Sequence, residues 1–284
     1  MQGCWRAVSL LFPVAMKPGV GKLRRDSLGV EWSKPHLTTM KEMSDYFNGV
    51  YDRGEHMWCS FLASYPAEAM HRFYQLTGDK TAAEGIIKAA RFMYNDMIVP
   101  TGTPKYAGGA PWGDQDMWMP WWDGVDAPAA LAHAVSKDTK YLLWGMAPAD
   151  WLLNYRGYGY SSGPWSWQGT LGFGGTLSGF LWSMREAGWT QDDLTKLRPD
   201  LDYEKALETC RGECLKYYDK AMQNTGESSR FCRLAAEVGR VLINQKKYDE
   251  AIEWLEKWKA APYGIYVNWA LDRARALKAG EQTP

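Results

Sequence analysis

The chain has 284 residues, and its 33 basic and 33 acidic side chains cancel. A neutral chain gives no compositional support for a polyanionic partner, so nucleic acid is not expected as a ligand. Apolar residues make up 46% and charged residues 23% of the chain, which is typical of a globular protein and excludes a disordered one.

Residues 1–38 are expected to form an irregular lead-in or a signal-like segment. Within them, residues 7–16 are an apolar run after Arg6, as in the core of a signal peptide, but no clear small-residue cleavage site follows. The same residues could equally be a remnant strand of an upstream domain, so the sequence leaves secretion or export to a periplasm open. No apolar run reaches the ~20 residues that cross a bilayer, so no membrane span is expected.

Residues 39–284 are expected to form a single all-α domain of helical hairpins. Apolar side chains recur at helical spacing, and no strand-rich region or βαβ alternation is present. Helices are predicted at about 39–52, 66–77, 80–98, 128–135, 140–154, 170–187, 202–222, 228–244, 247–259 and 264–278. Helix 170–187 is rich in glycine, which costs about 1 kcal/mol per residue in a helix and so predicts close helix packing or backbone near a ligand.

The cysteines are few, and their spacing favours buried thiols over a metal site. Cys210 and Cys214 lie one helical turn apart, and Cys232 belongs to the next predicted helix. No histidine lies near them in the sequence, whereas zinc sites usually have denser Cys and His spacing. No metal site is expected.

Residues 105–126 form the most unusual stretch of the chain. They contain four carboxylates and four indoles between prolines and glycines that prevent a long helix, which predicts an ordered loop. Trp and Tyr, at 16 residues each against 8 Phe, favour wet binding surfaces. Indole rings stack on sugar faces and carboxylates bind hydroxyls, so the loop is expected to bind a sugar through Trp112, Trp118, Trp121 and Trp122.

The carboxylates of this loop are the predicted catalytic groups. Glycoside hydrolysis needs one protonated and one ionised carboxyl group, and surrounding indoles raise the pKa of a carboxyl by desolvation. We expect Asp116 to act as the acid or base, with Asp114 or Asp123 as its partner. Asp126, ahead of Pro128, is expected to cap the following helix.

A second aromatic stretch, residues 156–169, is expected to form the opposite wall of the same cleft. It contains indoles and phenols but few charges. The predicted substrate-binding side chains from this stretch, together with one histidine from further upstream, are Arg156, Tyr158, Tyr160, Trp165, Trp167, Gln168 and His56.

Residues 73–79 (FYQLTGD), followed by Ala89-Ala90-Arg91-Phe92, resemble the hairpin turns of (α/α) toroid, six-hairpin-type carbohydrate-active enzymes. The resemblance covers roughly residues 40–190 and matches no specific glycosidase or lyase family. It implies a ring of helix pairs with a sugar cleft at one end. A complete ring needs a longer chain, so an incomplete ring or a fragment is expected, and residues 228–259 resemble a tetratricopeptide hairpin.

Three functions are consistent with these patterns, and the first is favoured: a glycoside hydrolase acting on an oligo- or polysaccharide. The second is a polysaccharide lyase on the same scaffold, with His56, His71, Tyr158 or Tyr160 as base and Arg156 as neutraliser. The third is a non-catalytic helical-repeat binding protein. Gly172-Phe173-Gly174-Gly175 lacks the strand context of a dinucleotide site, and no cofactor is expected. The sequence does not predict the oligomeric state.

Overall fold

The computed structural model describes residues 64–105, 127–155 and 179–280, together with the helical residues Lys41, Asp45 and Gly49. Within these ranges the chain is mostly helical, and its only extended pairing is an isolated antiparallel bridge between Ile98 and Pro104. The predicted all-α class is confirmed. Residues 1–38 lie outside the described ranges, so the predicted division at residue 38 stays a prediction.

The first helical hairpin consists of α4 (Ser64–Thr77) and α5 (Lys80–Arg91). The turn between them uses Gly78 with φ of +71°, a left-handed conformation that glycine adopts without strain. The Asp79 carboxylate then accepts a hydrogen bond from the Thr81 amide at 2.8 Å, which caps α5. This two-residue turn brings the two helices into antiparallel contact.

The second hairpin consists of α6 (Ala127–Ser136) and α7 (Lys140–Asn154), as the sequence predicted to within a residue or two. Lys137, with φ of +61°, forms the turn between them. At Gly145 a Cβ atom would lie 2.8 Å from the Ala129 Cβ and 2.6 Å from the Phe180 ring. The glycine therefore allows α6, α7 and the helical residues 179–186 to pack closely.

α5 continues as a π-helix, η2 (Phe92–Asp96), rather than as the regular helix predicted to residue 98. The chain then makes a compact turn in which the Val99 amide donates to Thr103 O and the Lys105 amide donates to Met97 O, both at 2.9 Å. Gly102, with φ of +90°, closes this turn. The widened turn of η2 and the bend after it lead the chain away from the α5 axis.

Residues 179–186 are helical, which agrees with the described part of the predicted helix 170–187, and η4 (Gln191–Thr195), a 3-10 helix, follows. Of the glycines in that predicted helix, only Gly179 is described. A Cβ atom at Gly179 would meet no described atom within 4 Å. Packing against the described residues therefore does not require a glycine at this position.

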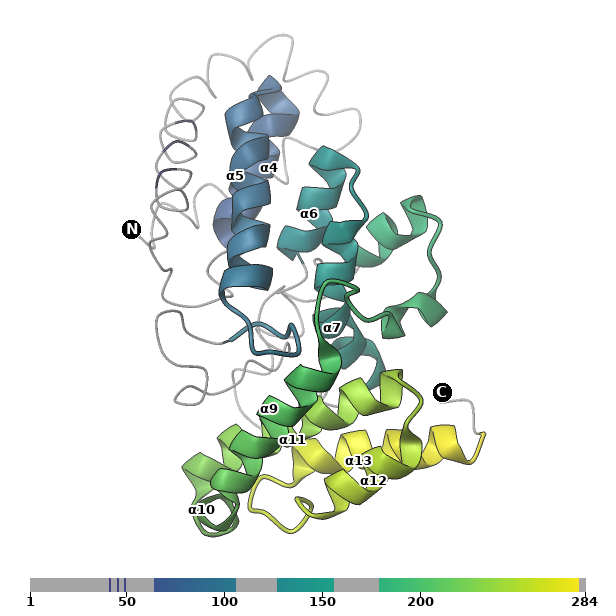
Figure 1. Cartoon of the computed structure of the whole chain (residues 1–284). Helices are drawn as coiled ribbons and strands as arrows, with labels where there is room; N and C mark the ends of the chain where they lie inside the picture. The colour runs from purple at the N-terminus through teal and green to yellow at the C-terminus, as the bar shows by residue number, and fades with distance from the viewer. Residues whose placement is uncertain are drawn as a thin grey trace.

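The C-terminal helices are α9 (Tyr203–Lys216), α10 (Tyr218–Gln223), α11 (Thr225–Asn244), α12 (Tyr248–Glu256) and α13 (Ile265–Lys278). The helix predicted over 202–222 is thus divided at Tyr217. α11 contacts each of the other four helices and is buried along almost its whole length. Figure 1 shows these helices gathered below the N-terminal hairpins, with α11 among them.

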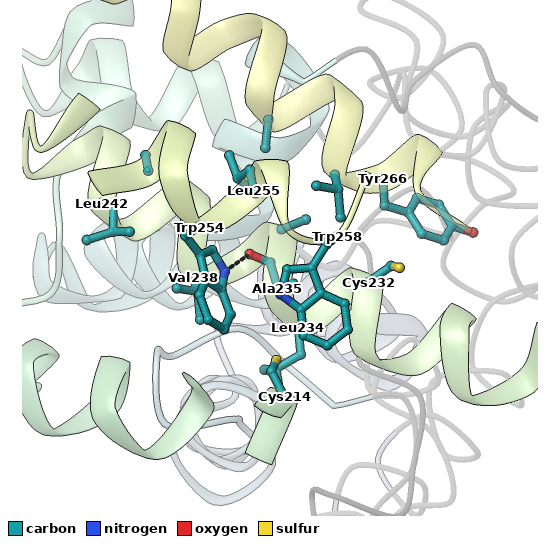
Figure 2. Packing of buried hydrophobic residues seen from close by; sticks show 14 of the residues in the cluster. Cys214, Cys232, Leu234, Ala235, Val238, Leu242, Trp254, Leu255, Trp258 and Tyr266 are labelled. Carbon is teal, nitrogen blue, oxygen red and sulfur yellow. Dashed lines mark hydrogen bonds between the residues drawn. The ribbon is translucent and has the colours of Figure 1, made fainter. Parts of the chain in front are cut away.

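Two indoles fill the core around α11, and Figure 2 shows them pointing toward it. The Trp254 indole N–H of α12 donates to the Ala235 carbonyl at 2.9 Å, and Trp258 is fully buried. At Gly239 a Cβ atom would lie 2.6 Å from Leu255 Cδ2, so α11 and α12 approach each other closely. This pair is the helical hairpin that the sequence predicted.

The two N-terminal hairpins pack side by side, with α5 against α6 and α4 also against α6. α6 and α7 are antiparallel, and α7 ends at α11, so α6 begins at that same end. α5 also ends there, through η2 and the turn over residues 97–105. Both long connections, 106–126 and 156–178, therefore start at the end of the hairpins that faces α11 (Figure 1). A closed ring of hairpins stays a prediction.

Candidate functional site

The predicted sugar site lies outside the described residues. This holds for the catalytic candidates Asp114, Asp116 and Asp123, for the predicted helix cap Asp126, and for the substrate-binding candidates Trp112, Trp118, Trp121, Trp122, Arg156, Tyr158, Tyr160, Trp165, Trp167, Gln168 and His56. What the structure describes is the pair of chain segments that lead into the two aromatic stretches. Both lead from one buried polar cluster.

The first aromatic stretch is entered through the turn over residues 97–105. Two threonines of this turn, Thr101 and Thr103, are buried and donate hydrogen bonds to the Glu237 carboxylate of α11, from Thr101 at 2.9 Å. A short polar turn is thereby attached to a helix more than 130 residues further along the chain. The entrance to residues 106–126 is thus held on α11.

The second aromatic stretch is entered through the last turn of α7. There the Trp151 indole N–H donates to the other oxygen of the same Glu237 carboxylate at 2.8 Å. The Tyr155 ring packs against the Trp151 indole with ring centroids 4.3 Å apart. Because Tyr155 is the last described residue before 156–178, the entrance to this stretch is also held on α11.

Arg240, one helical turn after Glu237, completes the attachment. Its guanidinium donates to both Glu237 oxygens, at 2.6 and 2.7 Å, and approaches the Asp150 carboxylate at 3.4 Å. Asp150 also accepts hydrogen bonds from Asn244 at 2.9 Å and Asn154 at 2.7 Å. We call the set Thr101, Thr103, Asp150, Trp151, Glu237 and Arg240 the polar junction.

The Glu237–Arg240 pair of the polar junction is buried and ionised. Glu237 is 0% exposed and Arg240 is 1% exposed. Burial raises the pKa of Glu237, but the Arg240 charge and the hydrogen bonds from Arg240, Thr103 and Trp151 outweigh burial and lower it below its ordinary value. The carboxylate therefore stays charged, and its two oxygens accept five hydrogen bonds.

A sealed carboxylate whose oxygens are all engaged does not exchange protons with a ligand. The Glu237 carboxylate instead fixes the relative positions of three segments: the turn at 97–105, the end of α7 and the middle of α11. Buried charge pairs of this kind are costly to break and specify one arrangement rather than adding much net stability. We therefore assign Glu237 and Arg240 a structural role: they fix the positions of the two loop entrances.

The two described histidines do not join the junction. Burial, followed by the neighbouring charge of Arg72, lowers the pKa of His71 in α4 to about 4, so its imidazole is neutral at pH 7. Burial also lowers the pKa of His133, and no described residue bonds its Nδ1 atom. His133 lies inside the packed hairpins, as expected for a structural residue.

The thiols of Cys210, Cys214 and Cys232 are free and buried in the core around α11, as predicted. Burial raises the pKa of Cys232 to about 11 and raises those of the other two, so the thiols are neutral. Among the described residues, no group of three metal-ligating side chains is close enough to hold an ion. The same ranges contain no helix with both the length and the apolar character needed to cross a bilayer.

Comparison of the chain with family models, curated proteins and solved structures finds no match. The polar junction was not predicted from the sequence, although a signal for it exists. Glu237 and Arg240 are charged residues at i and i+3 within the apolar stripe of a predicted helix, where an unpaired charge is not tolerated.

Proposed function

We propose that this chain is a carbohydrate-active enzyme that hydrolyses glycosidic bonds in an oligo- or polysaccharide. One observation carries the proposal: the described entrances to both aromatic stretches are bonded to the same Glu237 carboxylate. Both stretches are rich in indoles, and the first also carries carboxylates. Because their entrances are bonded to one buried group, they are suited to form two walls of one sugar site. Loops held by a rigid helical scaffold are where such sites usually lie.

In this proposal the carboxyl groups of residues 106–126 perform the reaction. Asp116 acts as general acid or base, and Asp114 or Asp123 activates water or attacks the anomeric carbon. The indoles stack on sugar rings and exclude water, which raises the pKa of the carboxyl that donates the proton. The separation of the two carboxyl groups decides between retention and inversion of configuration.

A reducing-sugar screen over plant and bacterial glycans tests the proposal on the full chain. Asp116→Asn is expected to lower kcat on any substrate that is cleaved by about 10²-fold or more, the usual contribution of a general acid or base. Asp192→Asn, an exposed residue of η4, is the matched control and is expected to keep full activity. Full activity in Asp114→Asn, Asp116→Asn and Asp123→Asn alike would contradict the proposal.

Ultraviolet absorbance, recorded on the same glycans, separates the two alternatives. A lyase forms an unsaturated uronate, which absorbs in the ultraviolet, whereas hydrolysis forms no new chromophore. A non-catalytic helical-repeat protein binds its ligand and releases it unchanged. Turnover without an absorbance change, and its loss in the aspartate variants, is the result expected for the hydrolase.

A further inference from the structure

Arg273 of α13 lies beside the polar junction but has no acidic partner in the described part of the chain. It is 7% exposed, and its guanidinium lies over the Tyr155 ring, 5.3 Å from the ring centroid. No described residue accepts a hydrogen bond from its Nε atom. The Tyr155 hydroxyl, in a residue that is 1% exposed, is likewise without a partner among the described residues.

The other buried arginines of the structure show what Arg273 lacks. Arg240 is bonded to Glu237 and Asp150, and Arg198 forms an ion pair with Asp200 at 2.6 Å. A buried guanidinium is normally paired in this way, because transfer of an unpaired charge out of water is costly. The ring of Tyr155 supplies a cation–π contact, which leaves the buried Nε–H of Arg273 without an acceptor among the described residues.

The neighbouring carboxylates are already engaged. Both Glu237 oxygens accept bonds from Arg240 and from the loop entrances, and both Asp150 oxygens accept bonds from asparagine side chains. Residues 156–178, which follow Tyr155 directly, contain no Asp or Glu. Neither source therefore supplies the counter-charge of Arg273.

The two groups that lack partners are both donors. A guanidinium has five N–H donors and no acceptor. Burial, followed by the charge of Asp150, raises the pKa of the Tyr155 hydroxyl well above its ordinary value, so that hydroxyl keeps its proton. A carboxylate matches the fork of an arginine with two parallel hydrogen bonds and accepts further bonds from a hydroxyl.

We propose that Arg273 and Tyr155 form a binding site for the carboxylate of a ligand, and that this ligand is a hexuronate-containing glycan. The carboxylate part follows from the two unpaired donors and from the contrast with Arg198 and Arg240. The sugar part rests on the proposed function, because Tyr155 directly precedes the second aromatic stretch. Arg273 is then the residue that selects acidic over neutral sugars.

Calorimetry on the full chain with glucuronate and galacturonate, and with glucose as the neutral probe, tests the site. The native chain is expected to bind one or both uronates in the millimolar range or tighter and to bind glucose more weakly. Arg273→Gln is expected to weaken uronate binding at least ten-fold. Arg275→Gln is the matched control, because Arg275 is an exposed arginine of the same helix that pairs with Glu256, and it is expected to bind as the native chain does.

A second variant keeps the test decisive if Arg273→Gln does not fold. Tyr155→Phe retains the ring beneath the guanidinium and removes only the hydroxyl, so it is expected to fold and to weaken uronate binding several-fold. Circular dichroism checks that each variant is folded. Uronate binding is also expected to weaken with added salt, since a charge pair is screened.

Three results would overturn the site: no uronate binding by the native chain, equal affinity for uronate and glucose, or unchanged uronate affinity in folded Arg273→Gln and Tyr155→Phe. Failure here is separable from failure of the proposed function. Asp116→Asn is expected to lose turnover and to keep uronate binding. If the chain binds uronate through Arg273 but cleaves no glycan, the carboxylate site is supported and the proposed hydrolase activity is contradicted.

Discussion

The N-terminal hairpins and the C-terminal helices build their cores in different ways. Between α4 and α7 each helix packs mainly on its neighbours, and much of the core consists of small or flexible side chains such as alanine and methionine. From α9 to α13 every helix packs on α11, and large indoles fill the gaps. The N-terminal core is thus distributed over several helices, whereas the C-terminal core depends on one, which also carries Glu237 and Arg240.

The largest effect should come from breaking the charge pair of α11. Glu237→Ala leaves Arg240 with a single weak carboxylate contact and leaves the donors of both loop entrances unpaired. We expect the free energy of unfolding to fall by about 3–5 kcal/mol, as for other buried pairs broken on one side. Urea titration followed by circular dichroism measures this change.

The control for that change is Glu253→Ala in α12, whose side chain is 77% exposed. It should alter the free energy of unfolding by less than about 0.5 kcal/mol. A loss below about 1 kcal/mol in Glu237→Ala would mean that the polar junction does not hold the N-terminal hairpins to the C-terminal helices. The two regions would then differ only in how their cores are packed.

The same carboxylate should make stability depend on acid. The pKa of Glu237 is lower in the folded chain than in the unfolded one, so its contribution is present above about pH 4.3 and is lost as pH falls through the folded pKa. In unfolding titrations between pH 7 and pH 3, the advantage of the native chain over Glu237→Gln should shrink as pH falls. An advantage that grows toward low pH would contradict this sign.

A smaller effect should come from adding one methyl group to each core. Gly239→Ala places a Cβ 2.6 Å from Leu255, and Gly145→Ala places one 2.6 Å from Phe180. Overpacking of this kind costs about 1–3 kcal/mol. We expect Gly239→Ala to cost more, because four helices pack on α11, whereas α7 packs mainly on α6 and η4. Urea titration compares the two.

Gly212→Ala in α9 is the control for both glycine substitutions. Gly212 is exposed, and a Cβ there meets no described atom within 4 Å. Alanine should therefore stabilise the helix by about 0.5–1 kcal/mol. An equal loss in the free energy of unfolding for Gly145→Ala and Gly239→Ala would show that the two cores accommodate an added methyl group equally well.

The smallest effects should come from removing one helix cap in each half. The Asn224 side chain accepts from the Gly226 and Glu227 amides at the start of α11, and Asp79 caps α5. Each substitution by alanine should cost about 1 kcal/mol. Hydrogen exchange should show faster opening over all C-terminal helices in Asn224→Ala, but only over the start of α5 in Asp79→Ala. If Asn224→Ala also opens only the start of its own helix, the C-terminal core does not depend on α11 more than the N-terminal core depends on α5.

Local signals predicted the hairpins well, because the residues that start and stop a helix act on their own neighbours. Gly78 and Asp79 ended one helix and began the next, and the polar residues 136–139 separated α6 from α7 as expected. The π-helix after Arg91 and the break at Tyr217 were missed. Both depend on what the chain packs against rather than on the residues themselves.

The polar junction could not be predicted from local sequence, because its contacts join residues far apart in the chain. Thr101 and Thr103 read as ordinary turn residues, and nothing near them indicates a carboxylate partner in α11. Only the Glu237 side of the contact carried a signal, as a charge within an apolar stripe. The predicted sugar-binding residues fall outside the described ranges, and they stay predictions.

The junction also sets an order of events during synthesis. Trp151 and Glu237 are 86 residues apart, so at about 5–20 residues per second the ribosome adds the acceptor about 4–17 s after the donor. Until then the N-terminal hairpins rely on their own alanine- and methionine-rich core. The two aromatic stretches consequently acquire a common anchor only once α11 has left the ribosome.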